Sequence, residues 1–315
     1  MPTNSVNNFA GIEVALDTMR GVVVTENGEV IDRREASYEP EQLIRAITEL
    51  TGGLRETAEV KSVGLAIPGL VNRETDRVLI STGLPFTAQQ HIHAELMQAT
   101  GLRYELENDA NAAAYGEYQA GAGRGARDIF YIGIGDAIGG AMILNGKLWT
   151  GASGCAGEIG HITIDTEGIE CVCGNTGCLE TTASGPNIVR RARERLNRDS
   201  TSSLSTLAMQ EDFTAGDLAA AANAGDDFSV MMLERTGRPL GIAVGSVINL
   251  LSLERIILGG TIMEAGALIL DPIIVEARKR SFQPCFEATK IVSAELGVDG
   301  VAIGAALLAR DTKGE

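Results

Sequence analysis

Residues 161–180 read HITIDTEGIECVCGNTGCLE and hold three of the chain's five cysteines and one of its three histidines. One residue separates Cys171 from Cys173, and Cys178 follows after four more. Glycines beside these cysteines let the loop turn tightly enough for three thiolates to meet at one point. With His161 as a fourth ligand, the set suits tetrahedral Zn²⁺ and leaves no open position for a catalytic water. The spacing therefore predicts a structural zinc site at His161, Cys171, Cys173 and Cys178. The alternative is a group of ordinary buried thiols beside a hydrogen-bonded histidine.

The other cysteines and the N-terminal segment bear on the cellular compartment. An odd number of cysteines disfavours a disulfide framework, and Cys155 and Cys285 have no such neighbours, so we expect them to be core residues. The segment MPTNSVNNFAG has no basic stretch followed by an apolar run, and no part of the chain approaches about 20 uninterrupted apolar residues. The sequence thus predicts a cytoplasmic protein without a signal peptide or membrane span.

Length and charge narrow the classes of function. A chain of 315 residues exceeds the usual size of one domain, which favours about two. Lys and Arg total 26 against 42 acidic residues, giving a net charge of −16, and we identify no run rich in Lys and Arg. Such a chain repels the phosphates of nucleic acids, so no nucleic acid is expected among its partners.

Strand-like and helix-like segments alternate along the chain, and each half opens with a meander of short strands. Strands are expected at 10–15, 21–25, 28–35, 60–69, 103–107, 128–135, 139–149, 255–262 and 290–296. Helices are expected at 40–57, 88–100, 109–121, 186–198, 226–252, 263–280 and 300–310, with a Ser/Thr-rich loop at 199–206. This order predicts duplicated α/β domains around a central cleft. Residues 1–108 with about 300–315 would form the smaller domain, and 109–299 the larger one that carries the zinc loop.

Four stretches resemble the ROK family of sugar kinases and sugar-responsive repressors: ENDANAAAYGE (107–117), GEIGHITI (157–164), CVCGNTGCLE (171–180) and LGGTI (258–262). The resemblance runs from about Gly11 to Leu308, and the cysteine loop that follows E-x-G-H is its most specific part. It implies an actin/hexokinase-like (ribonuclease H-like) α/β fold that assembles as a homodimer or homotetramer.

Phosphoryl transfer to a sugar hydroxyl requires a carboxylate that accepts the hydroxyl proton. Asp109 is the candidate, because it follows the expected strand 103–107 and begins a helix, where open α/β sheets commonly bind ligands. The alternative is that Asn108 or Asp109 only caps the helix. The resemblance implies that Asp109 is the general base and that Asn108 binds sugar hydroxyls.

The expected sugar ligands are groups that the zinc loop ties together. Polar groups that are left unpaired without a ligand discriminate best between sugars. The resemblance implies that Glu158, His161 and Glu180 contact the sugar, with one ring nitrogen of His161 on the metal and the other on a hydroxyl. It also implies that Gly69 borders the sugar. Either glutamate could instead be a solvated surface carboxylate. The sequence does not select among glucose, N-acetylmannosamine, fructose and allose.

The expected nucleotide loops depart from the pattern of ROK kinases. The first reads EVALD over 13–17, where the family has D-x-G-G-T, and the second reads GDAIGGA over 135–141, where the family has G-T-G-I-G-G-G. Asp17 and Asp136 therefore place carboxylates where hydroxyls usually meet phosphate, and a carboxylate beside a triphosphate is repulsive by several kcal/mol before screening. The residues that the resemblance assigns to MgATP are Glu13, Gly135, Gly139, Gly140, Gly259 and Gly260.

Two functions are consistent with these observations. The first is ATP-dependent phosphorylation of a hexose, glucokinase-like, with Asp109 as base, MgATP as cosubstrate and a structural Zn²⁺. The second is sugar sensing without catalysis, as in the ROK repressors, whose phosphate loops are similarly altered. Those repressors carry an N-terminal helix-turn-helix, whereas only some ten residues precede the first expected strand here. A sensor of this kind would act through a protein partner.

Overall fold

The computed structural model describes residues 7–196, 202–210 and 212–312. The chain forms two compact units. The first comprises Met1–Gly125, Ala141–Ala156 and Glu295–Glu315, and the second comprises Ala126–Gly140 and Gly157–Ala294. The expected division into domains at residue 109 stays a prediction.

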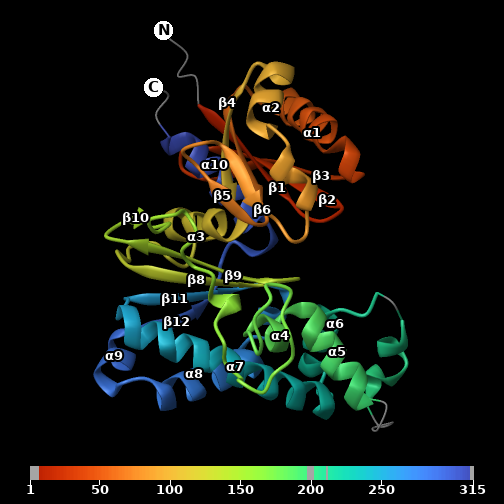
Figure 1. Ribbon diagram of the computed structural model, residues 1–315, viewed down its shortest axis with the longest axis vertical. Helices are drawn as coiled ribbons and strands as arrows, with labels where there is room; N and C mark the ends of the chain where they lie inside the picture. Colours follow the sequence, from red (N-terminus) through yellow and green to blue (C-terminus); the bar gives the residue numbers. More distant parts are fainter. Residues whose placement is uncertain (1–6, 197–201, 211, 313–315) are drawn as a thin grey trace. The chain divides into compact units, whose positions relative to one another are not determined.

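A five-stranded sheet with the order β3–β2–β1–β4–β7 organises the first unit (Figure 1). β1, β2 and β3 form an antiparallel meander, and β4 and β7 extend the sheet parallel to β1. The register aligns Glu13 with Ala66 and Ala66 with Glu107. The candidate residues of β1 and β7 therefore lie at the carboxyl ends of parallel strands, on the same end of the sheet. The strands are β1 (Asn8–Val14), β2 (Thr18–Thr25), β3 (Val30–Ser37), β4 (Val60–Ile67) and β7 (Arg103–Asn108).

Helices cover both faces of this sheet because successive strand residues point to opposite sides. Ile12 and Val23 pack with the apolar residues of α1 (Leu43–Thr57) and α2 (Ile92–Thr100), whereas Val22 and Val24 pack with α10 (Gly300–Asp311). On the α10 face the backbones themselves touch. A Cβ atom at Gly64 would lie 1.9 Å from the Ala305 carbonyl oxygen, which only glycine allows. α3 (Asp109–Ala120) lies against α10 on this face.

The second sheet has the order β10–β9–β8–β11–β12, in which β11 runs parallel to both β8 and β12. Its strands are β8 (Ile129–Ile134), β9 (Ile138–Leu144), β10 (Lys147–Leu148), β11 (Arg255–Gly259) and β12 (Lys290–Ser293). The long helix α7 (Asp227–Leu251) lies beside α8 (Ala267–Arg280) on one side of β11 and β12 (Figure 1). Glycines of α7 allow close packing, since a Cβ at Gly241 would meet Glu276 of α8 at 2.6 Å.

Every expected strand and helix has a counterpart, with shifted ends. The expected strand 139–149 is divided by a turn in which Asn145 and Gly146 have positive φ, and the expected strand 255–262 ends at Gly259. The expected helix 186–198 corresponds to α5 (Gly185–Leu196), and its last residues and part of the 199–206 loop lie outside the described residues. The elements that were not expected are β5 (Leu70–Asn72), β6 (Arg77–Ile80), α4 (Glu180–Ala183), α6 (Ala215–Asn223) and α9 (Gln283–Ala288).

Candidate active site and metal centre

Asp109 is the first residue of α3, directly after β7. Its Oδ1 accepts hydrogen bonds from the backbone N–H of Ala110 and from Nδ2 of Asn108, both at 2.9 Å. Among the described residues nothing donates to Oδ2. The carboxylate is therefore oriented through one oxygen and keeps the other for a ligand.

Asn108 is the N-cap of α3, because its Oδ1 accepts the backbone N–H of Asn111 at 2.9 Å. Its amide nitrogen donates to the carbonyl oxygen of Gly69 and to Asp109, each at 2.9 Å. Asn108 thus performs the capping that the sequence left open between two residues. Asp109 is then free of that role, and Asn108 joins the Gly69 turn to the candidate base.

The electrostatic environment of Asp109 favours a proton acceptor. Burial raises the pKa of Asp109, against the opposing effect of the hydrogen bonds from Ala110 and Asn108. A carboxylate with a raised pKa is a stronger base than one in water. The arrangement suits general-base chemistry.

Sequence reasoning missed Glu107, whose buried carboxylate accepts hydrogen bonds from the start of α3. Its Oε1 accepts from the Asn108 backbone N–H and from Nδ2 of Asn111, both at 2.9 Å, and burial raises its pKa. The guanidinium of Arg73 lies 3.4 Å from Oε2. The sequence of β7, RYELEN, gave no clear signal, because Glu105 is a second acidic residue only two positions earlier and is not buried as deeply.

The first expected nucleotide loop joins β1 to β2. The Ala15 N–H donates to the Thr18 carbonyl at 2.8 Å, and the Tyr38 hydroxyl donates to the Ala15 carbonyl at 2.6 Å. Leu16 and Asp17 are exposed at the tip of the turn. None of the residues 13–18 has a positive φ. The turn is thus formed without a residue in the left-handed region.

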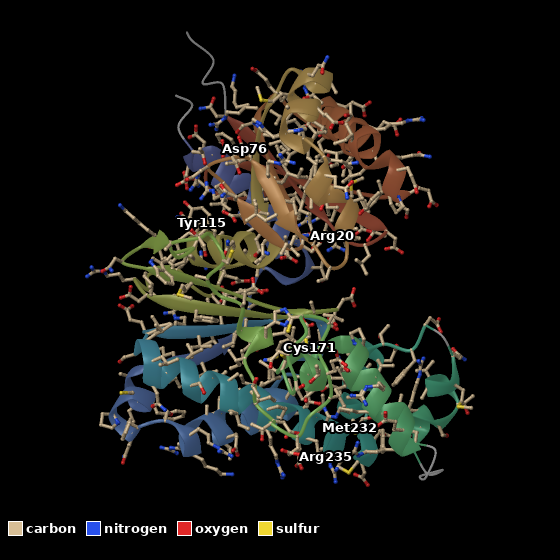
Figure 2. All side chains as sticks on the ribbon, in the orientation of Figure 1. Arg20, Asp76, Tyr115, Cys171, Met232 and Arg235 are labelled. Atoms are coloured by element: carbon tan, nitrogen blue, oxygen red, sulfur yellow. The ribbon has the colours of Figure 1, made fainter. Side chains whose placement is uncertain are left out.

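Glu13, the last residue but one of β1, belongs to a cluster of charged side chains. Arg20, labelled in Figure 2, lies 3.5 Å from Glu13 Oε2 and also pairs with Glu35 at 2.9 Å. Burial raises the pKa of Glu13 to about 7, with Arg20 opposing the shift and Asp109 adding to it. Oε2 is buried without a hydrogen bond. The Asp109 charge therefore lies close enough to Glu13 to raise its pKa.

The second unit holds the predicted metal centre, in which one ligand atom from each of His161, Cys171, Cys173 and Cys178 lies within 4.8 Å of the others. The Cys171 Sγ lies 3.6 Å from His161 Nδ1, and the sulfurs of Cys173 and Cys178 are 3.7 Å apart. These separations match the edge of about 3.8 Å expected for a tetrahedron with Zn–S bonds of about 2.3 Å. Cys171 is labelled in Figure 2.

The surroundings of this centre suit a bound cation. Burial raises the pKa of the Cys178 thiol to about 12, so a thiolate there requires a positive charge beside it. Asn175 donates to Cys178 Sγ at 3.5 Å and to Thr163 Oγ1 at 2.9 Å, which fixes the loop. Because Nδ1 of His161 faces the sulfurs, its Nε2 points to the other side, 4.0 Å from Glu158 Oε2. The donor set fits a closed tetrahedral metal site.

Three of the glycines assigned to nucleotide binding in this unit, Gly135, Gly259 and Gly260, lie at the ends of two parallel strands, and Gly139 and Gly140 lie at the start of β9. β8 and β11 pair with Gly133 opposite Gly259, so Gly135 and Gly260 follow at the same edge of the sheet. Gly260 has φ 108°, and a Cβ there would lie 1.9 Å from the Ile134 carbonyl oxygen. Asp136 is exposed on the loop between β8 and β9. This edge is where α/β sheets bind ligands.

The predicted sugar residues of this unit adjoin the same loop. Glu180 Oε2 accepts the backbone N–H of Ile138 at 2.9 Å, and Glu180 is itself buried. A Cβ at Gly140 would lie 2.5 Å from the carbonyl oxygen of Gly157, next to Glu158. Glu180 and the E-x-G-H segment are thus both held against the start of β9, whereas the Glu158 side chain is 44% exposed.

The structure corrects the expectation for the two remaining cysteines. Cys155 and Cys285 are each partly exposed and do not belong to the core. Cys155 lies in the loop after β10, and Cys285 lies in the short helix α9. No helix among the described residues is both long and apolar enough to cross a membrane.

Comparison with known structures identifies the fold as actin/hexokinase-like, which confirms the expected class. A ROK glucokinase from Streptomyces griseus, solved with glucose and AMPPNP, superposes with a TM-score of 0.88 at 30% identity and covers 97% of this chain and 100% of its own. The profile of the ROK family matches residues 9–312. The chain belongs to the ROK family.

Relatives with different activities lie in this family. The chain is 31% identical over 316 residues to a glucokinase of Halalkalibacterium halodurans, covering 96% of this chain and 94% of the relative. It is 27% identical over 308 residues to a xylose repressor of Caldicellulosiruptor bescii, covering 95% of this chain and 77% of the repressor. The family therefore includes both catalytic and regulatory relatives of this chain.

Proposed function

We propose that the chain is an ATP-dependent hexose kinase in which Asp109 is the general base. The observation that carries the proposal is the orientation of Asp109, whose Oδ1 is held by two donors while Oδ2 accepts nothing from the described residues. Asn108 already caps α3 by accepting the Asn111 N–H, so the helix does not need Asp109 for that role. Similarity to glucokinases, including one solved with glucose and AMPPNP, supports the same activity.

In the proposed reaction, Oδ2 of Asp109 accepts the proton of the sugar hydroxyl as that oxygen bonds to the γ-phosphorus of ATP, and ADP leaves. Asn108 keeps the carboxylate in position through its bond to Oδ1. The Gly69 carbonyl accepts a hydrogen bond from the same asparagine. A sugar that borders Gly69 would therefore lie beside a carboxylate already held in position. MgATP would be held by Glu13 and by Gly135, Gly139, Gly140, Gly259 and Gly260.

We propose that the metal is Zn²⁺, bound by His161, Cys171, Cys173 and Cys178, and that it supplies rigidity only. With Nδ1 of His161 on the metal, Nε2 carries the proton and donates to a sugar hydroxyl beside Glu158. Glu180, held by the Ile138 N–H, completes the proposed sugar ligands.

One observation favours the second candidate function, a sugar sensor without catalysis. Asp17 and Asp136 are both exposed on the turns expected to meet the phosphates, and their charges oppose nucleotide binding. A sensor would keep the sugar residues and the metal while the nucleotide loops change. The 27% identity to a xylose repressor is consistent with a sensor of this kind.

One experiment separates the two candidates. Purified protein is titrated with glucose by calorimetry, and ADP formation is followed with glucose and MgATP present. Glucose-dependent ADP release supports the kinase, whereas glucose binding without ADP release supports the sensor. A protein that binds neither glucose nor the other three candidate sugars contradicts both.

A further inference from the structure

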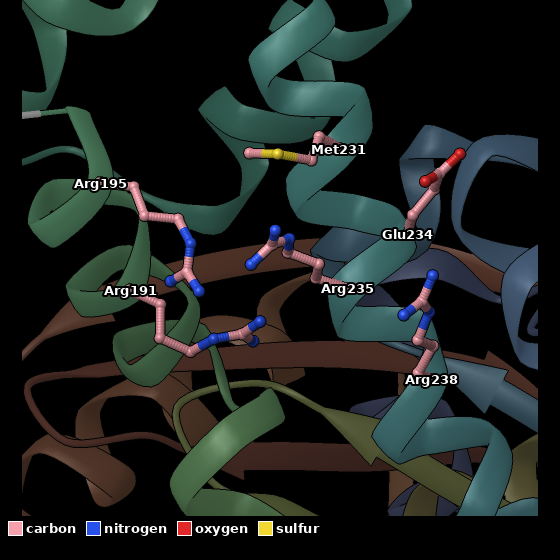
Figure 3. A pocket seen from close by; sticks show the side chains of 6 residues that line it. All are labelled: Arg191, Arg195, Met231, Glu234, Arg235 and Arg238. Atoms are coloured by element: carbon pink, nitrogen blue, oxygen red, sulfur yellow. The ribbon is translucent and has the colours of Figure 1, made fainter. Parts of the chain in front are cut away.

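A cavity of about 500 Å³ in the second unit is lined mainly by arginines of α5 and α7 (Figure 3). Figure 3 shows the guanidinium groups of Arg191 and Arg195, from α5, turned toward that of Arg235, from α7. Glu234 points away from the three groups. The lining residues are Arg191, Arg195, Met231, Glu234, Arg235 and Arg238.

This concentration of positive charge is unusual in a chain with a net charge of −16. Residues 190–195 and 234–238 together hold six arginines and two glutamates. The sequence RRARER at 190–195 also corrects our expectation that the chain has no Lys/Arg-rich run. Two helices that pack side by side thus bring like charges together, although repulsion opposes that approach.

Three of the lining arginines are not held by other side chains or carbonyls of the described residues. Arg195, Arg235 and Arg238 form no hydrogen bond or ion pair with the described residues. Arg191 differs, since it donates to the Thr182 carbonyl at 2.8 Å and to Thr236 Oγ1 at 3.4 Å. Burial lowers the pKa of Arg191 to about 10, and the charges of Arg195, Arg190 and Arg235 lower it in the same direction. The guanidinium still carries its charge at neutral pH.

We propose that this cavity binds a small polyanion with two or more phosphate groups. Guanidinium groups bind phosphate oxygens in pairs, and three that converge match the several charged oxygens of a di- or triphosphate. The volume is that of a small-molecule site and is too small for a nucleic acid helix. The occupant supplies the negative charge that the described lining largely lacks.

The cavity also has a physical link to the proposed sugar site. Arg191 holds the carbonyl of Thr182, which lies in α4 two residues after Glu180. Glu180 in turn accepts the Ile138 N–H of the nucleotide loop at 2.9 Å. A polyanion that draws the Arg191 guanidinium toward itself weakens the bond to Thr182. We expect α4 to loosen and sugar affinity to fall, and this second step rests on the proposed function of Glu180.

Binding is tested with inorganic triphosphate as the probe, titrated calorimetrically without Mg²⁺ into the full chain. The test variant is Arg195→Gln with Arg235→Gln, because neither side chain forms a hydrogen bond or ion pair with the described residues. The matched control is Arg45→Gln with Arg55→Gln, two exposed residues of α1 that give the same change in charge. The cavity variant should bind about 100-fold more weakly, since each arginine contributes about tenfold through charge-assisted bonds.

Three results overturn the site: no binding by the unmodified chain, equal losses in both variants, or full binding in the cavity variant. Equal losses would indicate general charge attraction, and full binding would place the triphosphate on the nucleotide loops. Affinity should also decline as salt rises, as expected for exposed ionic contacts.

The coupling has its own test, which does not use turnover. Glucose affinity is measured with and without triphosphate, and a decrease of about fivefold is expected in the unmodified chain but not in the cavity variant. An unchanged glucose affinity refutes the coupling and leaves the binding site. A chain that binds triphosphate but no sugar refutes the proposed function and leaves the binding site intact.

Discussion

Replacing Asp109 with asparagine tests the proposed base most directly. The variant Asp109→Asn keeps the size of the side chain, and its Oδ1 can still accept from Ala110 and Asn108. The amide nitrogen then occupies the place of Oδ2 and donates hydrogen bonds, so it cannot accept the hydroxyl proton. We expect turnover to fall by about 10² to 10⁴-fold, the usual contribution of a positioned base. Sugar affinity should change by about tenfold or less, because one hydrogen bond is altered.

The same substitution should stabilise the fold at neutral pH. Because burial raises the pKa of Asp109, folding works against the ionised carboxylate at every pH above its unfolded pKa. A neutral amide removes that opposition. The melting temperature at pH 7.5 should therefore rise while turnover falls, and a residue with only a structural role would give the opposite sign for stability.

The assays are ADP release with saturating glucose and MgATP, glucose titration, and thermal unfolding followed by the single tryptophan, Trp149. Asp271→Asn, on the exposed side of α8, is the control for loss of one negative charge. Equal losses of turnover and sugar affinity would refute the reasoning, because they would identify Asp109 as a sugar-holding residue. So would a lower melting temperature with unchanged turnover.

Further outcomes concern the metal, the nucleotide loops and Glu13. Elemental analysis should find about one zinc per chain. The variant Cys171→Ser should lose the zinc and much of the stability, since small zinc sites contribute on the order of 10 kcal/mol. The control Cys285→Ser should keep both, and zinc-free native protein would exclude the site. Restoring the loops should tighten MgATP binding in calorimetric titration, because it removes two charges and allows closer backbone approach; the unmodified chain binding equally well would contradict this. The restored variant combines Ala15→Gly, Leu16→Gly, Asp17→Thr and Asp136→Thr. For Glu13, whose folded pKa of about 7 exceeds the unfolded value of 4.5, stability should fall as pH rises between these values. Melting curves of Glu13→Gln should show a weaker fall over that range, and parallel curves for the two proteins would refute the shift.

The sequence predicted the grouping of His161 with three cysteines because these residues are close along the chain. Cys171, Cys173 and Cys178 lie within eight consecutive positions, so local turns decide their convergence. Asp109 was also recognisable, since it stands where a strand gives way to a helix. The fold class followed from the same logic, because alternation of strands and helices restricts the sheet to a few topologies.

Features that depend on contacts distant in sequence were out of reach. The hydrogen bond between Asn108 and Gly69 joins residues 39 positions apart, and no sequence pattern predicts it. The arginine cavity lies between α5 and α7. In the sequence the arginines of each helix suggest only a solvated helix face, and they form a cavity only when the two helices pack. The hairpin of β5 and β6 was missed because its strands are short and follow a Pro-Gly turn, which usually ends a strand.

The contact of α10 with Gly64 has a consequence for how the protein is made. The first unit begins at the N-terminus, yet one face of its sheet is closed by residues 300–311. A ribosome releases the N-terminal strands first, when this face has nothing to cover it. The second unit, which ends at Ala294, has all its residues available before α10 emerges. The unit that starts first is therefore the last to finish folding, and the nascent chain must keep an apolar sheet face from aggregating until its final helix arrives.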